Sequence, residues 1–294
     1  MNENKRNTYK LFGGVHTLSI TTDKFLQKQA PNTIKECVDI AYYSNRKVTS
    51  IKINPNKLHG DINTFSELKD VLQYIFTELE IDDFKITRID FKLDSTELGH
   101  YKAYEKLNRY IISMLSMIYK VKNRYRTTDL LTLEQISVAC KNNAFEIEHY
   151  DKAHQMHGNG TTTSRLEIRS KRLSIDNLDD IQNVFMESWE RRFDKMLLYG
   201  FSELENYLAQ KLYDKYKENL ADYNRFEEFL FDNRLYLYKG SLTTKLYELA
   251  EIPNAENRAK DFKRRKANIE YFSKADVRYA VDEIKRCIDD FFRV

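Results

Sequence analysis

Residues 145 to 152 read "FEIEHYDK", and this stretch alternates apolar and polar side chains as a β-strand does. Side chains two positions apart share one face of a strand, so Glu146, Glu148, Tyr150 and Lys152 should point one way and Ile147 the other. The stretch therefore predicts a strand with one ionisable face. Tyr150, one of 20 tyrosines in the chain, lies on that face.

Two further stretches, "RIDFKLD" (88–94) and "SRLEIRSK" (164–171), show the same alternation. Their polar positions are Arg88, Asp90, Lys92 and Asp94 in the first, and Arg165, Glu167 and Arg169 in the second. If the three strands are neighbours, their polar faces form one patch of carboxylates, cations and a phenol.

Two interpretations of this patch remain open. One is the solvated face of an antiparallel sheet, on which acids and bases form cross-strand pairs. The other is a metal-assisted site for phosphoryl transfer, because Mg²⁺ takes carboxylate oxygens and a phenol needs activation before it can attack.

The rest of the chain predicts the elements around these strands. Residues 9–58 read as short strands, residues 64–80 as a helix with a capping box at Thr64 and Glu67, and residues 100–119 as a second helix. Residues 176–200 predict a helix that ends at Gly200, and helices follow to residue 294. We therefore expect an α+β fold: an antiparallel or mixed sheet with packed helices in residues 1–172, and a helical region in residues 173–294.

Composition sets the broad class of protein. The chain has 294 residues, of which 41% are hydrophobic and 32% charged, with a net charge of +3. Cys37, Cys140 and Cys287 lie far apart, which indicates neither a disulfide framework nor a zinc motif. No apolar run approaches the roughly 18–20 residues of a membrane span, and the first residues are polar. We expect a cytoplasmic protein with no membrane partner.

Basic residues cluster near the C-terminus, and the cluster consists of Arg258, Lys260, Lys263, Arg264, Arg265 and Lys266. The pattern over residues 241–271 suits a helix-turn-helix with its turn at Pro253-Asn254, which would place the cations on a DNA-recognition helix. An ordinary solvated helix explains the same pattern, since Glu256 and Asp261 lie there too. A second basic stretch, "YKVKNRYR" (119–126), suits single-stranded DNA.

Four segments resemble, in the same order, the Rep_trans-type initiators of staphylococcal rolling-circle plasmids. The segments are "INPNKL" (53–58), "ITRIDFKLD" (86–94), "FEIEHYDK" (145–152) and "SRLEIRSKR" (164–172). The family shows similar stretches: an Asn-Pro-Asn-Lys-Leu turn, a "TRLD" strand, a "YNK" strand and an "RVEIELKR" strand. The resemblance spans residues 48 to 172.

The resemblance implies a replication initiator that nicks one strand at a double-strand origin. A tyrosine forms a 5′-phosphotyrosine adduct, the free 3′-OH primes synthesis, and the strand is later rejoined. Origin DNA, both duplex and melted, a second copy of the chain and a host helicase are the implied partners. The implied cofactor is a divalent metal, Mg²⁺ or Mn²⁺.

Carried onto this sequence, the resemblance makes Tyr150 the nucleophile and Lys152 its catalytic neighbour. Asp90, Glu167 and Asp94 become the expected metal ligands. We expect Arg88, Arg165 and Arg169 to contact DNA, together with the C-terminal residues Arg258, Lys263, Arg264, Arg265 and Lys266.

The chain departs from the family at three positions: Gln155 replaces a glutamate, Asp151 an asparagine and Ser164 an aromatic residue. His149, His154 and His157 could supply another ligand. Three alternatives stay open: a relaxase of a conjugative element, a DNA-binding regulator that has lost the chemistry, which Gln155 would permit, and a solvated sheet with an unrelated binding role.

Overall fold

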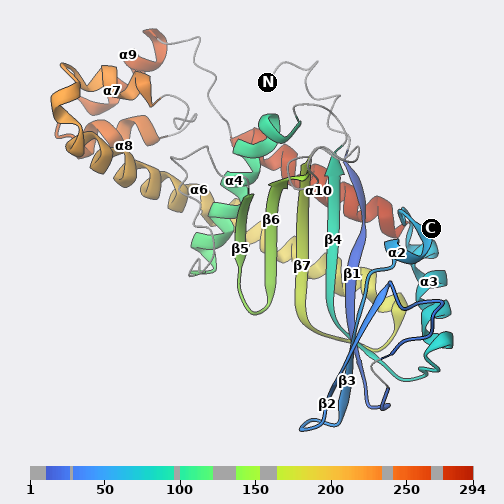
Figure 1. Cartoon of the computed structure of the whole chain (residues 1–294). Coiled ribbons are helices and arrows are strands. Elements are labelled where there is room, and N and C mark those ends of the chain that lie inside the picture. Colours follow the sequence, from blue (N-terminus) through green and yellow to red (C-terminus); the bar gives the residue numbers. More distant parts are fainter. Residues whose placement is uncertain are drawn as a thin grey trace.

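The computed structural model describes residues 11–26, 29–95, 100–121, 137–152, 164–233, 241–265 and 274–293, with the backbone alone for residues 100–106 and 137–138. Within these ranges the chain forms one sheet and a set of helices (Figure 1). The predicted α+β class is confirmed.

The sheet has seven strands in the order β2-β3-β1-β4-β7-β6-β5, and each neighbouring pair is antiparallel. The strands are β1 (Phe12–Thr22), β2 (Val38–Tyr43), β3 (Val48–Ile53), β4 (Lys85–Ser95), β5 (Ser137–Lys141), β6 (Phe145–Asp151) and β7 (Ser164–Ile175). The three strands with ionisable faces, β4, β7 and β6, are therefore consecutive neighbours, as the proposed patch requires.

The described helices are α2 (Asn56–His59), α3 (Phe65–Glu78), α4 (His100–Ile118), α6 (Ile181–Glu218), α7 (Phe226–Asp232), α8 (Leu242–Leu249), α9 (Ala255–Arg265) and α10 (Lys274–Phe292), with short 3-10 turns η1 (Leu178–Asp180) and η2 (Leu220–Asp222). The capping box at the start of α3 is present, because the Thr64 hydroxyl accepts from the Glu67 N–H and the Glu67 carboxylate accepts from the Thr64 N–H. None of the described helices combines the length and apolar composition that crossing a membrane requires.

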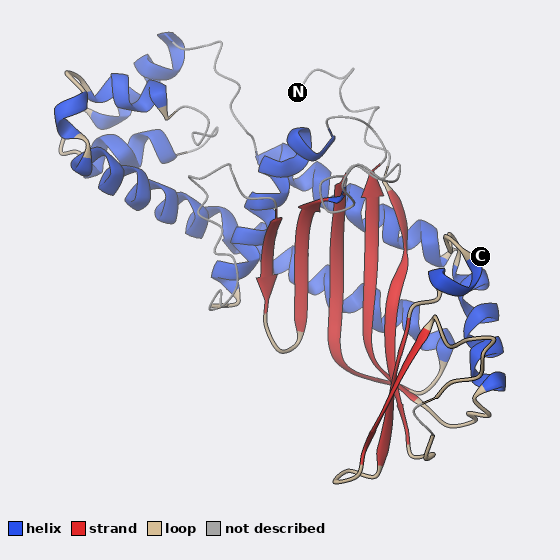
Figure 2. Ribbon diagram, in the orientation of Figure 1, coloured by secondary structure: helices blue, strands red, loops and turns tan. Residues whose placement is uncertain are grey.

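Helices α4, α6 and α10 pack against one face of the sheet (Figure 2). Phe91 of β4 lies at the centre of this layer, with its ring 5.3 Å from Phe291 and 5.8 Å from Phe185. Residues two positions from it on the strand, Ile89 and Leu93, are also fully buried. Strand alternation thus sends the apolar side chains to the helices and the ionisable side chains to the opposite face.

The region after residue 172 does not form one separate body. β7 continues to Ile175, and α10 returns to pack beside β1 and β4. The approach is close, since a Cβ added at Gly13 would lie 3.0 Å from the carbonyl oxygen of Cys287. Helices α7, α8 and α9 instead lie around the far half of α6, away from the sheet (Figure 1). The long helix α6 links the sheet to this helical lobe.

The predicted end of a helix at Gly200 is wrong, because α6 runs through it to Glu218. A glycine inside a helix costs only about 1 kcal/mol relative to alanine, so it does not by itself end a helix. Gly200 has a packing role instead. It is buried against α4, and a Cβ added there would lie 2.8 Å from Cβ of Met114.

We expect Gly200→Ala to lower the free energy of unfolding, although alanine is the better helix former. Overpacking a tight contact costs about 1–3 kcal/mol, which exceeds the roughly 1 kcal/mol gained in helix propensity. Urea denaturation of the variant measures the change. Glu203→Ala, at an exposed position of the same helix, is the control and should be close to neutral. A Gly200→Ala variant more stable than the wild type would show that α4 moves aside at little cost.

Candidate active site

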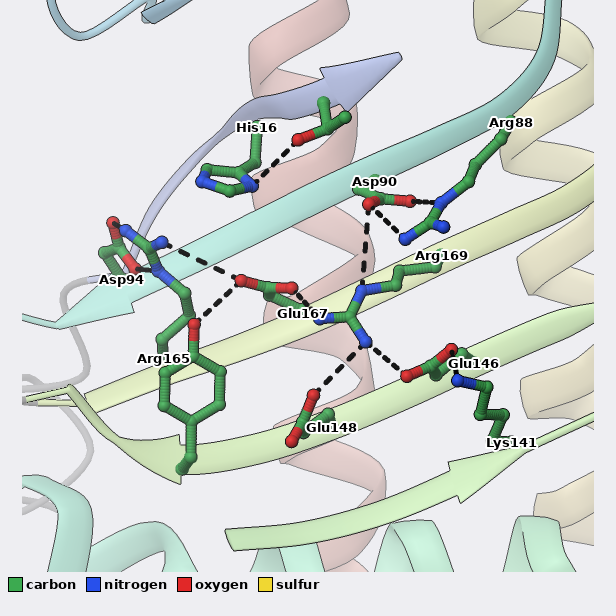
Figure 3. Close-up of polar contacts among 12 residues, drawn as sticks. His16, Arg88, Asp90, Asp94, Lys141, Glu146, Glu148, Arg165, Glu167 and Arg169 are labelled. Carbon is green, nitrogen blue, oxygen red and sulfur yellow. Dashed lines mark hydrogen bonds and ion pairs between the residues drawn. The ribbon is translucent and has the colours of Figure 1, made fainter. Parts of the chain in front are cut away.

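The strand register brings the ionisable side chains of β4, β7 and β6 together. In the register, Arg165 of β7 lies between Asp94 of β4 and Tyr150 of β6. Arg169 of β7 likewise lies between Asp90 of β4 and Glu146 of β6. Figure 3 shows the side chains of Asp90, Asp94, Glu146, Arg165 and Arg169 on the same face of the three strands. We call the set the polar face; its members are Arg88, Asp90, Lys92, Asp94, Glu146, Glu148, Tyr150, Arg165, Glu167, Arg169 and Lys171.

The centre of the polar face is buried rather than solvated, although the cross-strand acid–base pairs that the interpretation of a solvated face predicted are present. Asp90 is 3% exposed, Glu167 4% and Arg165 7%. Taking a charge out of water costs several kcal/mol unless an opposite charge and hydrogen bonds compensate. The acids and bases of the polar face accordingly alternate and contact one another.

Tyr150 and Glu167 form the central hydrogen bond of the polar face. The Tyr150 hydroxyl donates to Oε1 of Glu167 at 2.8 Å. Burial, together with the charge of Glu167, raises the pKa of Tyr150, so the phenol is neutral at pH 7. Burial alone would raise the pKa of Glu167, but Arg169 and the Tyr150 hydrogen bond outweigh it and the pKa is lowered. The pair is thus a neutral phenol that donates its hydrogen bond to an ionised carboxylate, an arrangement in which the carboxylate could accept the phenol proton.

Arg165 and Lys152 place positive charge on both sides of Tyr150. Arg165 donates from Nε and Nη2 to the two oxygens of Asp94, at 2.5 and 2.7 Å, and its Nη1 lies 3.7 Å from Oε1 of Glu167. Burial opposes the charge of Arg165, but Asp94 raises its pKa and keeps it ionised. Nζ of Lys152 lies 5.9 Å from the centre of the Tyr150 ring. Two cations therefore lie near the Tyr150 side chain.

Arg169 contacts four carboxylates of the polar face. It donates to Glu146 and Glu167 in short contacts and to Glu148 at 3.2 Å, and its Nε lies 3.8 Å from Asp90, an ion-pair distance too long for a hydrogen bond. Glu148 stands directly opposite Glu167 in the register. Burial raises the pKa of Glu148, with Glu167 adding to the effect and Arg169 opposing it. One guanidinium therefore holds four acids together.

The carboxylates expected to bind a metal are each occupied by a guanidinium. Both oxygens of Asp90 accept from Arg88, at 2.6 and 2.7 Å, as those of Asp94 do from Arg165. Glu167 accepts from Tyr150 and Arg169. Among the residues that the structure describes, no group of three or more His, Cys, Asp or Glu side chains could hold a metal ion. This donor set does not fit a divalent metal.

His149 lies on the opposite side of β6 from Tyr150, so it cannot join the polar face as a ligand. It is 2% exposed, and burial, helped by the charge of Arg109, lowers its pKa to about 3. The other candidate histidines, His154 and His157, lie outside the described residues, as do Gln155 and Lys266.

We expect His149 to make stability depend on pH. The unfolded chain binds a proton at His149 below a pKa of about 6.5, whereas the folded chain does so only near pH 3. Stability is therefore lost as pH falls through this window, by up to about 1.4 kcal/mol per pH unit. Denaturant unfolding between pH 7 and 4 should show a flatter dependence in His149→Gln than in the wild type. His59→Gln, at an exposed position, should keep the wild-type slope; parallel curves for all three proteins would contradict the expectation.

His16 belongs to the site, although alternation along the sequence does not single it out. It sits at an irregularity of β1 between Val15 and Thr17, where the pairing with β4 shifts register. Figure 3 shows its imidazole on the side of Glu167, with Nδ1 3.1 Å from the Thr17 hydroxyl. Burial lowers the pKa of His16 while Glu167 opposes the effect. A bulge moves a side chain to the other face without a signature in the alternation.

The predicted helix pair near the C-terminus is present as α8 and α9, joined by a turn in which Glu251 and Asn254 have positive φ angles of 54° and 58°. Its cations do not share one face. Arg258 and Arg265 line a cavity of about 850 Å³ together with the α7 acids Glu227, Glu228 and Asp232. Arg264 instead lies 3.1 Å from Asp261, with most of its side chain exposed.

Comparisons with known proteins give one distant likeness. No protein-family model matches the chain, and no curated protein matches it. Among solved structures, it is similar to a rolling circle replication initiator protein from Geobacillus stearothermophilus, with 15% identity and a TM-score of 0.32, over 59% of this chain and 77% of that chain. So distant a likeness carries no conclusion about function.

Proposed function

We propose that this protein is a DNA strand-transfer enzyme of the rolling-circle initiator type, with Tyr150 as the nucleophile. The hydrogen bond from the Tyr150 hydroxyl to Glu167, between the cations Arg165 and Lys152, is the observation that carries the proposal. The four sequence segments that resemble plasmid initiators support it, because two of them, β6 and β7, supply these residues.

In the proposed reaction the Tyr150 oxygen attacks the phosphorus of one phosphodiester. The phenol proton passes to Oε1 of Glu167, the bond from phosphorus to the 3′ oxygen breaks, and that oxygen takes up a proton from water to become the 3′-OH. The 5′ phosphate stays on Tyr150 as a phosphodiester. Attack by a 3′-OH reverses these steps and rejoins the strand.

Glu167 is needed in this scheme because Tyr150 does not ionise by itself. Burial and the neighbouring carboxylate raise the pKa of Tyr150, so its proton must leave during the attack rather than before it. A phosphate that enters beside Arg165 would draw guanidinium charge away from Glu167. The carboxylate would then become a better base at the moment when it receives the proton.

The test is a covalent adduct between protein and DNA. The protein is incubated with supercoiled DNA and with a random-sequence pool of 3′-labelled single-stranded oligonucleotides, and products are separated under denaturing conditions. We expect the 3′ label on the protein and, by peptide mapping, a phosphotyrosine at residue 150. Binding of DNA with no adduct on any substrate would favour a DNA-binding regulator instead, for which the α8–α9 helix pair is the supporting feature.

The resemblance also suggests a homodimer, a host helicase as partner and a double-strand origin as substrate, and these form part of the proposal. A conjugative relaxase would use the same chemistry. The two roles differ in the fate of the 3′-OH: an initiator leaves it to be extended by a polymerase, so the nicked product should prime synthesis in vitro.

A further inference from the structure

We propose that the guanidinium of Arg165, rather than a divalent metal ion, supplies the positive charge at the scissile phosphate, so that strand transfer proceeds in the presence of a chelator. The inference rests on the proposed function, and it concerns the source of the charge rather than the identity of the nucleophile.

The carboxylate oxygens that a metal would need are already engaged. Asp90 and Asp94 each accept two hydrogen bonds from one arginine fork, and Glu167 accepts from both Tyr150 and Arg169. A divalent ion prefers such oxygens, but here it would have to displace a guanidinium from them. The resident cations make these carboxylates poor ligands.

The guanidinium groups that a metal would displace have nowhere to go. The side chains of Arg165 and Arg169 are only 8% and 14% exposed, so neither can move its charge into water without a large rearrangement. A metal bound beside them would add two positive charges next to two buried ones. Repulsion at short range in a buried setting opposes that arrangement.

Arg165 lies beside the Tyr150–Glu167 pair. It pairs directly with Tyr150 across β6 and β7, and its Nη1 lies 3.7 Å from the oxygen that accepts the Tyr150 proton. Asp94 fixes the plane of the fork through Nε and Nη2. With Nε and one N–H of Nη2 given to Asp94, the Nη1–Nη2 edge of the guanidinium is left to donate paired hydrogen bonds to phosphate oxygens, and its charge is present at every working pH. Arg165 thus places a fixed donor group where the attacking oxygen meets phosphorus.

The experiment measures adduct formation by wild-type protein, first dialysed against a chelator, in EDTA, in Mg²⁺ and in Mn²⁺. We expect rates within about threefold of one another. Arg165→Met should lower the rate by about 100-fold or more, which is typical of losing a donor to a developing charge, and added Mn²⁺ should not restore it. Arg165→Lys, which keeps the charge but loses the fork, should fall between the two.

Arg286→Met is the matched control, because Arg286 also makes two acidic contacts, to Glu283 and Asp290, but on the surface of α10. It should keep the wild-type rate. An adduct that forms only with Mg²⁺ or Mn²⁺ would overturn the inference and leave the proposed function standing. The wild-type comparison needs no variant, so misfolding of Arg165→Met cannot obscure it. Absence of adduct under every condition would overturn the proposed function, and the inference with it.

Discussion

Tyr150→Phe should abolish the covalent adduct with DNA, reducing its rate of formation by roughly a thousandfold or more, as expected when a nucleophile is removed. The ring stays in place and only the hydroxyl is lost, so the variant should fold. The lost hydrogen bond to Glu167 is worth about 1 kcal/mol in stability, and Arg169 still pairs with that carboxylate. Denaturing electrophoresis with 3′-labelled DNA measures the adduct, and urea denaturation measures the stability.

Tyr43→Phe is the control for this change, because Tyr43 is 52% exposed at the edge of the sheet and far from β6 in the strand order. It should form adduct at the wild-type rate. If the adduct survives in Tyr150→Phe, another residue is the nucleophile, and peptide mapping of the labelled protein would identify it. DNA binding should be nearly unchanged in both variants, which separates loss of chemistry from loss of the substrate complex.

Local patterns predict much of this fold because they depend on near neighbours in the chain. Alternation assigns the two faces of β4, β6 and β7, and the capping box fixes the start of α3 at Thr64. These are properties of backbone geometry over a few residues. Which strands become neighbours is a different matter. The pairing of β4 with β7 joins residues far apart in the chain, such as Asp90 and Arg169, and only tertiary packing decides it.

The candidate site also has a part that local patterns predict and a part that only tertiary packing decides. Alternation places Tyr150, Glu167 and Arg165 on ionisable faces, but the register decides that Arg165 stands between Asp94 and Tyr150. A shift by two residues would preserve every face and break every one of these pairs. The metal ligands expected from the resemblance show this effect. Asp90, Asp94 and Glu167 are acids, as a metal site requires, but in the folded protein each of them contacts an arginine.

Burial and irregular backbone are the features that sequence patterns could not supply. Charged residues in alternation usually face water, yet Asp90 and Glu167 are almost fully buried. His16 reaches the polar face through an irregularity in β1, and Gly200 serves a close contact of two helices rather than a helix end. Each depends on what lies across from the residue, which alternation does not encode.

Arg169→Met should cost about 3–5 kcal/mol of stability at pH 7, the range expected when one partner of a buried ion pair is removed. Methionine has a similar length but no charge, so Glu146, Glu148, Glu167 and Asp90 would be left together without their shared cation. Guanidinium denaturation at neutral pH measures the loss. Arg286→Met, which removes exposed pairs worth about 0–1 kcal/mol, is the control.

The pH dependence of the same variant distinguishes charge from packing. In the wild type the pKa values of Glu146 and Glu167 are lowered, so their stabilisation is present above a pKa of about 4.5 and is lost as pH falls. Without Arg169 the crowded carboxylates should have raised pKa values, and the folded protein would then bind more protons than the unfolded chain. The stability deficit of Arg169→Met relative to the wild type should therefore shrink from pH 7 to pH 5, because the loss caused by His149 is common to both proteins. A deficit that stays constant across this range would mean that Arg169 acts through packing alone, and the polar face would not be the network of compensating charges inferred from its contacts.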